Sequence, residues 1–335
     1  MQGPGCVKWD ITYACPLRCE HCCSESGRRL SQQLKLPEMM RVADSLIELR
    51  PPVVEFAGGE PLLVKEIFQV AEHIAEAGIP VWLYTSGWLF DEAVLPEIMS
   101  VFSEVRISLD GATAKVHDHI RGRVGSFMRA MRALEMLDAA VASSDVEDFS
   151  FGVDVAVRRS NFSQLEMFAT EISCRFPMLN FLWLGTAFPS GLWNREFFSD
   201  SELLDNDQLA KFRAPDFARR LQSLAPDSVS VRFAYPDLSA LVDEIDFMMQ
   251  VEPDGLVRAI PTCEETVGSL LGEPAAVLWG RAMERRKDKF VVDLFSAVDS
   301  MTGWAQANRL IDDRYGSSDA RDRIARRPVC VQLGN

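Results

Sequence analysis

Features that would direct this chain into or across a membrane are missing from its sequence. No apolar run reaches the roughly 18 residues that a transmembrane helix needs. The N-terminus also lacks a charged segment followed by an apolar stretch, the mark of a secretory signal. We therefore expect no membrane partner and a cytoplasmic location.

Basic residues are scarce relative to acidic ones. The 335 residues include 35 Lys and Arg against 49 Asp and Glu, for a formal net charge of −14. Such a surface repels the phosphate backbone, so we expect no nucleic-acid partner, and a neutral or cationic substrate fits better. The alternative is that the extra carboxylates only keep the surface solvated.

Cysteines do not cluster again after residue 22. Of the eight cysteines, Cys15, Cys19 and Cys22 follow the spacing C-x3-C-x2-C, and the others are scattered: Cys6, Cys23, Cys174, Cys263 and Cys330. Without a secretion signal, this usage favours metal ligands and free thiols over disulfides. Three thiolates in one loop suit an iron-sulfur cluster with one iron left open. Zinc bound by the same cysteines with His21 or Cys23 is the alternative.

Strand-like and helix-like segments alternate along the first half of the chain. The pattern predicts helices at residues 36–49, 67–77, 92–101, 128–141 and 163–175, and strands at 7–13, 53–57, 81–85, 105–109, 151–157 and 180–184. This rhythm predicts an α/β fold with a parallel sheet, either barrel-like or doubly wound. In both architectures the active face lies beyond the C-terminal ends of the strands.

The alternation stops after Gly191. A polar stretch with a helical segment at 207–224 follows, and then short strands at 229–233 and 257–260 and a helix at 270–286. We predict a main domain at 1–195, a helical linker at 196–225 and a smaller α+β C-terminal domain at 226–335.

Motifs at the predicted strand ends resemble those of the radical S-adenosylmethionine (radical SAM) enzymes. Cys15, Cys19 and Cys22 match the cluster loop of that family, and Gly58-Gly59-Glu60-Pro61 matches its SAM-binding loop. Thr85-Ser86-Gly87 resembles the family's Thr-Asn-Gly, with Ser in place of Asn. Residues 105–111, with 117–118 and 121–122, resemble the subgroup that carries SPASM or twitch C-terminal domains. The resemblance implies a partial, six-stranded (β/α) TIM-like barrel, one 4Fe-4S cluster and bound SAM.

The resemblance also assigns SAM-binding roles to side chains. Gly58, Gly59 and Pro61 would shape the loop around the SAM amino group, and Glu60 would accept from that group, with a solvated turn carboxylate as the alternative. Thr85 belongs to the same predicted set.

Four further residues complete that set. Ser108 and Asp110 would reach the SAM ribose or the substrate, or else cap their strand end. Arg121 would pair with the SAM carboxylate, or form a surface salt bridge. Asn161 would contact SAM, or cap the helix predicted from residue 163.

The C-terminal region lacks the cysteines of an auxiliary cluster. The turn Glu252-Pro253-Asp254-Gly255 resembles the SPASM and twitch pattern, yet only Cys263 lies near it. We therefore expect a degenerate domain and a single cluster. Some epimerases of this subgroup use a lone C-terminal cysteine as hydrogen-atom donor, and this is our predicted catalytic role for Cys263; a small buried packing residue is the alternative.

Together these features predict an enzyme that reductively cleaves SAM to a 5′-deoxyadenosyl radical and abstracts hydrogen from its substrate. An external one-electron reductant such as flavodoxin or ferredoxin would supply the electron. We expect a small polar metabolite, a sugar or aminoglycoside-like natural product, and a redox-neutral step such as epimerisation. Only 14 residues precede Cys15, so no leader-peptide-binding domain is expected and peptide maturation is the alternative. A non-catalytic iron-sulfur sensor is the alternative from another class.

Overall fold

A computed structural model describes residues 3–29, 32–144, 148–244 and 247–328 of the chain. Its strands are β1 (Cys6–Thr12), β2 (Val54–Gly58), β3 (Val81–Thr85), β4 (Glu104–Ser108), β5 (Ser150–Val157), β6 (Phe181–Thr186), β7 (Ser230–Ala234), β8 (Met248–Val251), β9 (Leu256–Arg258) and β10 (Thr266–Ser269). Its α-helices are α1 (Leu36–Leu49), α2 (Ile67–Glu76), α3 (Leu95–Val101), α4 (Ala114–Arg121), α5 (Ser126–Ala142), α6 (Leu165–Met167), α7 (Glu196–Glu202), α8 (Asn206–Arg213), α9 (Pro215–Leu224), α10 (Leu241–Glu244), α11 (Ala275–Arg286), α12 (Lys289–Ser296), α13 (Met301–Tyr315) and α14 (Ser318–Ala325).

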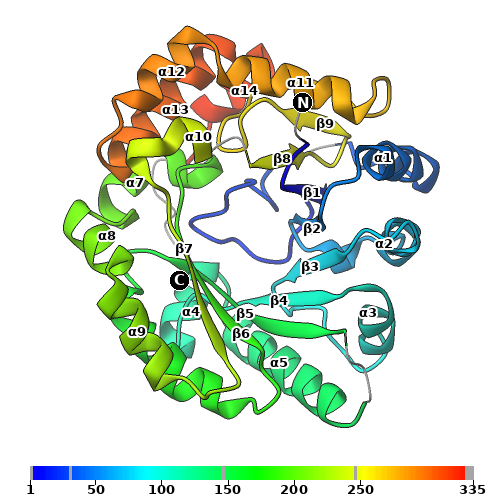
Figure 1. Cartoon of the computed structure of the whole chain (residues 1–335), viewed down its shortest axis with the longest axis vertical. Coiled ribbons are helices and arrows are strands. Elements are labelled where there is room, and N and C mark those ends of the chain that lie inside the picture. The colour runs from blue at the N-terminus through cyan, green and yellow to red at the C-terminus, as the bar shows by residue number, and fades with distance from the viewer. Residues whose placement is uncertain (1–2, 30–31, 145–147, 245–246, 329–335) are drawn as a thin grey trace.

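The strands form one curved sheet in the order β10-β9-β8-β1-β2-β3-β4-β5-β6-β7. Every neighbouring pair from β8 to β7 is parallel, and β9 and β10 are added antiparallel at one edge. Helices α1, α2, α3 and α5 lie along the outer side of the curve (Figure 1). The α/β fold with a partial TIM-like barrel is thus confirmed.

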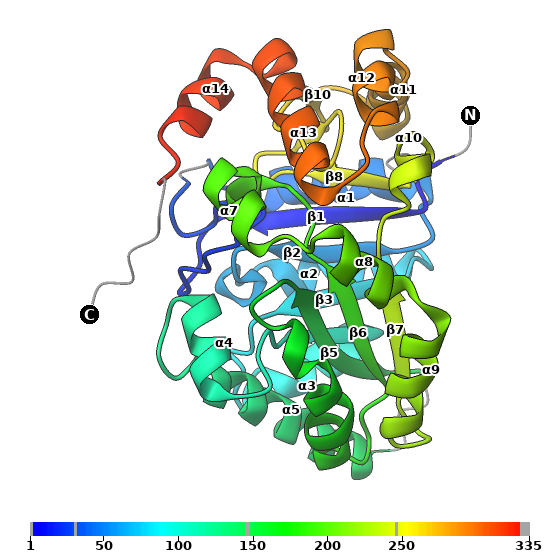
Figure 2. The ribbon, with the colours of Figure 1, turned by 90° about the vertical axis from the view of Figure 1, so that its left-hand side faces the viewer.

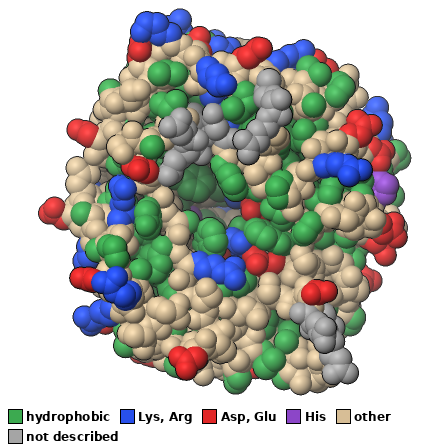
Figure 3. Space-filling view, in the orientation of Figure 1, with side chains coloured by type: hydrophobic (Ala, Val, Ile, Leu, Met, Phe, Trp, Pro, Cys, Tyr) green, Lys and Arg blue, Asp and Glu red, His purple; other side chains and the backbone are tan. Residues whose placement is uncertain are grey.

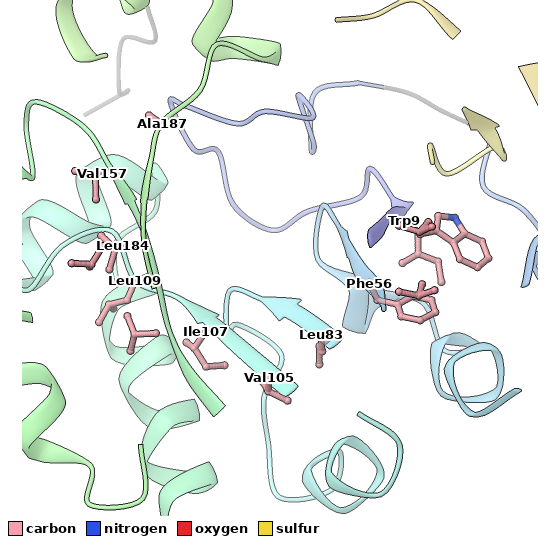
Figure 4. Packing of buried hydrophobic residues seen from close by; sticks show 14 of the residues in the cluster. Trp9, Phe56, Leu83, Val105, Ile107, Leu109, Val157, Leu184 and Ala187 are labelled. Carbon is pink, nitrogen blue, oxygen red and sulfur yellow. The ribbon is translucent and has the colours of Figure 1, made fainter. Parts of the chain in front are cut away.

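Alternate residues of the strands build the core between sheet and helices. Trp9, Phe56, Leu83, Val105 and Val155 project from β1 to β5 and are fully buried. Figure 4 shows several of these side chains packed along consecutive strands. The residues between them point to the inner side of the curve. The loops that follow the C-terminal ends of the strands are where a site is expected in such a barrel.

The sheet extends beyond the six strands predicted from the sequence. β7 pairs with β6, so α8 and α9 lie in the crossover between two parallel strands of one sheet. Pro215 divides the predicted helix 207–224, because a proline in a helix interior removes a hydrogen bond and clashes with the preceding turn. The domain division at 195 and 226 stays a prediction.

The segment predicted as helix 163–175 is irregular. It consists of 3-10 turns at Phe162–Gln164 and Ser173–Arg175, α6, and a π-helical turn at Phe168–Ile172. Further 3-10 turns occupy Pro61–Leu63, Gly191–Asn194 and Leu238–Ala240.

The C-terminal helices α11 to α14 gather beyond β1 and β8 (Figure 2). Helix α11 packs against β10 at the edge of the sheet, and α12, α13 and α14 follow through successive helix–helix contacts. None of the helices in the described part of the chain is long and apolar enough to span a bilayer.

Candidate active site at the cysteine loop

The three clustered cysteines lie in the loop that follows β1. Backbone hydrogen bonds join this loop to the end of α4, from Arg18 N to Arg121 O at 3.1 Å and from Glu20 N to Ile120 O at 3.1 Å. Cys19 is buried, and Cys15 and Cys22 are half-buried. The loop is therefore fixed at two points while two of its thiols reach open space.

Several N–H and O–H groups point at the sulfur atoms. Leu17 N donates to Cys15 Sγ at 3.4 Å, and Ser26 N donates to Cys22 Sγ at 3.1 Å. The hydroxyl of Ser24 lies 3.5 Å from Cys22 Sγ. Such donors favour the thiolate form that a cluster requires and tune cluster potential.

Burial opposes the thiolate form of two of the three cysteines. Burial raises the pKa of Cys15 and of Cys19 to about 12, so without a metal both stay protonated. Within the described residues, no three His, Cys, Asp or Glu side chains converge closely enough to hold a single metal ion.

The Gly58-Gly59-Glu60-Pro61 loop lies directly on the start of the cysteine loop. Gly59 N donates to Thr12 O at 2.7 Å and Glu60 N to Ala14 O at 2.9 Å. A Cβ on Gly59 would lie 2.0 Å from the Ala14 carbonyl oxygen, and one on Gly58, which has φ +120°, would lie 2.4 Å from that of Thr12. Only glycine permits this approach of two loops.

We expect Gly59→Ala to destabilise the protein by about 1–3 kcal/mol, because backbone atoms must move to admit the methyl group. The same displacement should reduce iron retained after anaerobic reconstitution. Urea unfolding and iron analysis check this. Gly272→Ala is the matched control, since nothing lies within 4 Å of its added Cβ, and equal losses in both variants would contradict the prediction.

Glu60 is fully buried and holds the loop after β3. Its carboxylate accepts from Thr85 Oγ1 at 2.7 Å, Ser86 N at 3.0 Å and Leu62 N at 3.4 Å, and from the Ser86 hydroxyl. A carboxylate has about four acceptor sites, so these donors occupy it. The predicted SAM contact of Glu60 stays a prediction, and in this structure its charge organises the Thr85-Ser86-Gly87 turn.

Asp110 is the centre of a buried charge cluster at the end of β4. Its Oδ2 lies 2.7 Å from Arg121 Nε and 3.1 Å from His21 Nε2, and its Oδ1 accepts from Ala156 N at 3.0 Å. Burial alone would raise the pKa of Asp110, but Arg121 and His21 hold it well below its usual range. This cluster joins the cysteine loop, through His21, to β4 and α4.

Arg121 and Asn161 both have protein partners. Arg121 pairs with buried Asp110 rather than forming a surface salt bridge. Asn161 donates to Asp110 O and to Ala156 O, both at 2.9 Å, and accepts from Arg158 N at 2.8 Å. It makes no side-chain cap at the turn that follows it. Ser108 is half-buried at the end of β4. The SAM contacts of all three stay predictions.

His117 of α4 contacts the backbone just after β4. It is buried, and its Nδ1 accepts from Asp110 N at 3.1 Å. Burial, aided by Arg121, lowers the pKa of His117 from 6.5 to about 3. The ring is therefore neutral in the folded protein at neutral pH.

This shift predicts a pH dependence of stability. The unfolded chain binds a proton at His117 below about pH 6.5 and the folded chain does not, so stability falls as the pH decreases. From pH 8 to pH 5 this site should account for a loss of about 2 kcal/mol. His117→Asn, which keeps an acceptor, should flatten that slope in urea unfolding, and His119→Asn, whose side chain is 58% exposed, should not. An unchanged slope in His117→Asn would contradict the assignment.

Cys263 is fully buried beside α13, where its thiol donates to Asn308 Oδ1 at 3.5 Å. Asn308 donates in turn to Pro189 O at 2.7 Å. With no exposed surface, the thiol is out of reach of a substrate in this conformation. The donor role of Cys263 stays a prediction.

Sequence reasoning missed the contacts that the C-terminal end of the described chain makes with the cysteine loop. Arg327 Nη2 lies 2.6 Å from Glu25 Oε1 and 2.7 Å from Glu264 Oε1. Arg323 Nη2 lies 2.6 Å from Glu264 Oε2. Glu25 N donates to Cys22 O at 3.3 Å, so these arginines hold the segment just after the third cysteine.

Polar residues line the inner side of the barrel. Lys8, Glu55, Tyr84, Arg106 and Asp154 occupy strand positions between the core residues. Strands of a fully buried parallel sheet are nearly continuous in apolar residues, so charges at alternate positions signal a second, polar face. That signal was available in the sequence.

Comparison with known proteins places these features in a family context. Residues 9–154 match the sequence profile described as "Radical SAM superfamily". The chain is 35% identical over 174 residues to "Mycofactocin maturase MftC" of Mycobacterium tuberculosis (strain CDC 1551 / Oshkosh), covering 52% of this chain and 43% of that protein. It is 29% identical over 165 residues to "AdoMet-dependent heme synthase" of Methanosarcina barkeri (strain Fusaro / DSM 804), covering 49% and 45%. The chain thus spans less than half the length of these relatives.

Solved structures with the same fold include Streptococcus suis SuiB bound to S-adenosylmethionine. It matches with TM-score 0.63 and 12% identity, over 88% of this chain and 68% of that one. Native anSMEcpe with bound AdoMet matches with TM-score 0.58 and 16% identity, over 96% and 98%. At these identities the likeness shows the fold alone.

Proposed function

The chain belongs to the radical SAM superfamily, whose members use a 4Fe-4S cluster and SAM, and on that premise we propose that it cleaves SAM and modifies a peptide substrate. The observation that carries the proposal is the cysteine loop, held at the strand ends with N–H groups aimed at its sulfurs and the Gly58–Pro61 loop packed on it.

Cys15, Cys19 and Cys22 are the proposed ligands of the cluster. When bound, the cluster and SAM supply a carbon-centred radical that abstracts hydrogen from the substrate. The residues of the chain hold the loops in place, since Glu60 fixes the turn after β3 and Asp110 joins β4 to the cysteine loop. An external one-electron reductant such as flavodoxin or ferredoxin is the proposed electron source.

The proposed peptide substrate replaces the small polar metabolite favoured by the sequence. MftC is named a maturase, and SuiB has also been solved bound to precursor peptide SuiA. Other relatives are named heme synthases, so the family context alone does not fix the substrate.

Anaerobic reconstitution followed by assay for 5′-deoxyadenosine tests the proposed activity. We expect about four irons per chain and SAM cleavage under strong reductant, because a single 4Fe-4S cluster suffices. Bound iron without any 5′-deoxyadenosine would favour the sensor alternative and overturn the proposed activity. About eight irons per chain would instead reveal an auxiliary cluster.

The hydrogen-donor role of Cys263 has a separate test. If its thiol returns a hydrogen atom to the substrate radical, Cys263→Ala should stall turnover while 5′-deoxyadenosine still forms. The hydrogen at the target carbon should then come from solvent or reductant. Unchanged product formation by Cys263→Ala would remove the assignment and leave packing as its role.

A further inference from the structure

The inner side of the curved sheet carries charged and aromatic side chains from five consecutive strands. Core residues such as Val7, Trp9 and Ile11 alternate along β1 with residues that face inward. The inward-facing set is Lys8 and Asp10 of β1, Glu55 of β2, Trp82 and Tyr84 of β3, Glu104 and Arg106 of β4, and Asp154 of β5. Figure 3 shows the molecule hollowed near its centre, with acidic, basic and hydrophobic side chains around the opening.

Two arginine side chains on this face approach the same carboxylate, that of Glu104. Arg106 pairs with Glu104 at 2.6 Å, and its guanidinium lies between the rings of Trp82 and Trp183, 4.6 and 4.4 Å from their centroids. Arg232 of β7 approaches the same Glu104 at 3.7 Å. Two arginines therefore converge on one carboxylate.

The remaining carboxylates, Asp10, Glu55 and Asp154, have only Lys8 as a nearby lysine. Lys8 lies opposite Glu55 in the β1–β2 register, and its Nζ is 5.4 Å from the centre of the Tyr84 ring. Burial alone would lower the pKa of Lys8, yet Cys23 first, and then Asp10, Glu55 and Asp154, raise it. Arg106 also lies near Glu55 and Asp154, and Arg258 and Arg29 lie near Asp10, although none of these arginines forms an ion pair with the three carboxylates among the described residues.

Asp10 and Glu55 give the observation that points to a ligand. They are 5% and 9% exposed, and none of the hydrogen bonds and ion pairs of the described residues involves either carboxylate. Their oxygen atoms are not among the fully enclosed polar atoms without a partner, so they remain accessible. Burial raises the pKa of Asp10, of Glu55 and of Asp154, and the cations nearby only partly offset that rise. A buried carboxylate without a partner is costly, and a bound cation offsets that cost.

We propose that this inner face binds a cationic group of the substrate, an ammonium or guanidinium, between Asp10, Glu55 and Asp154. The inference rests on the proposed function and specifies its substrate class, a peptide that presents a basic side chain or a free amino group. The ring of Tyr84 adds an aromatic face that suits a cation. Lys8 keeps the three carboxylates from repelling one another before the substrate arrives.

Binding of matched small probes to the reconstituted wild-type enzyme tests the inference. The probes are N-acetyl-lysine amide, which is cationic, and N-acetyl-norleucine amide, which has a similar chain without charge. Because a hydrogen bond to a charged group is stronger than one to a neutral group, we expect the cationic probe to bind at least about tenfold more tightly. Ligand-detected NMR gives both affinities.

Variants locate the probe. Glu55→Gln and Asp154→Asn keep the shape of each side chain and should each weaken the cationic probe about tenfold while leaving the neutral probe unchanged. Glu135→Gln is the control, since the Glu135 side chain is 51% exposed and pairs with Arg175 on the surface. Thermal unfolding checks that all three variants fold.

Three results would overturn the inference: equal affinity for the two probes, no binding of the cationic probe, or undiminished binding by both variants. A failure of the proposed function is seen separately, as absence of 5′-deoxyadenosine from wild-type enzyme assayed without any probe. The two failures are therefore distinguishable in one preparation.

Discussion

Cys19→Ala is expected to remove the bound cluster and to reduce 5′-deoxyadenosine formation at least about 100-fold. Changes to groups that only support metal ligands already cost 10–100-fold, and the loss of a ligand should exceed that. Cys19 is the buried member of the three cysteines and lies beside Arg121, so no other thiol can take its place without moving the loop. Iron analysis and absorption spectra measure the first effect, and a chromatographic assay measures the second.

Cys174→Ala is the matched control for that result. Cys174 is exposed, and its variant should retain wild-type iron content and SAM cleavage. Retention of a full cluster in Cys19→Ala would contradict the ligand assignment for Cys19. A comparable loss in both variants would point to general thiol damage rather than to the cysteine loop.

Asp110→Asn is expected to destabilise the protein by about 3–5 kcal/mol, the cost of removing one partner from a buried ion pair. The substitution keeps the size of the side chain but leaves the Arg121 guanidinium, 2.7 Å away, without its counter-charge. His21, 3.1 Å from the same oxygen, loses its partner too, which loosens the cysteine loop. Urea unfolding at constant pH gives the change in free energy.

A surface pair supplies the comparison for Asp110. Glu135 and Arg175 are 2.9 Å apart with both side chains about half exposed, and Glu135→Gln should change stability by less than about 1 kcal/mol. If Asp110→Asn were equally mild, the carboxylate would be protonated in the folded protein rather than ionised. The low pKa argued for Asp110 would then be wrong.

Local sequence signals predicted the strands and the loops at their ends well. The helix at 36–49 and the strand at 81–85 coincide with α1 and β3, because periodicity and the prolines after residue 50 act within a few residues. The cysteine spacing likewise depends on one short loop. Features set by nearby residues are the ones a single sequence can reveal.

Features set by distant residues were not foreseen. β7 joins β6 and β8 joins β1 through pairings that no local pattern specifies. Asn161 was given a cap as its alternative role, yet it bridges β4 and β5, which meet only in the folded sheet. The polar inner face was visible as alternating charges, but knowing that Asp10 and Glu55 lack partners required the three-dimensional arrangement.

The contact between Arg327 and Glu25 has a consequence for the order in which the protein is made. The two residues are 302 positions apart, so the cysteine loop leaves the ribosome long before its arginine partner is synthesised. Closing so long a loop is slow compared with local folding. A nascent chain interrupted before α14 would hold all three clustered cysteines and still lack the charge that fixes the segment after Cys22. The segment after Cys22 therefore reaches its final position only when nearly the whole described chain has been translated.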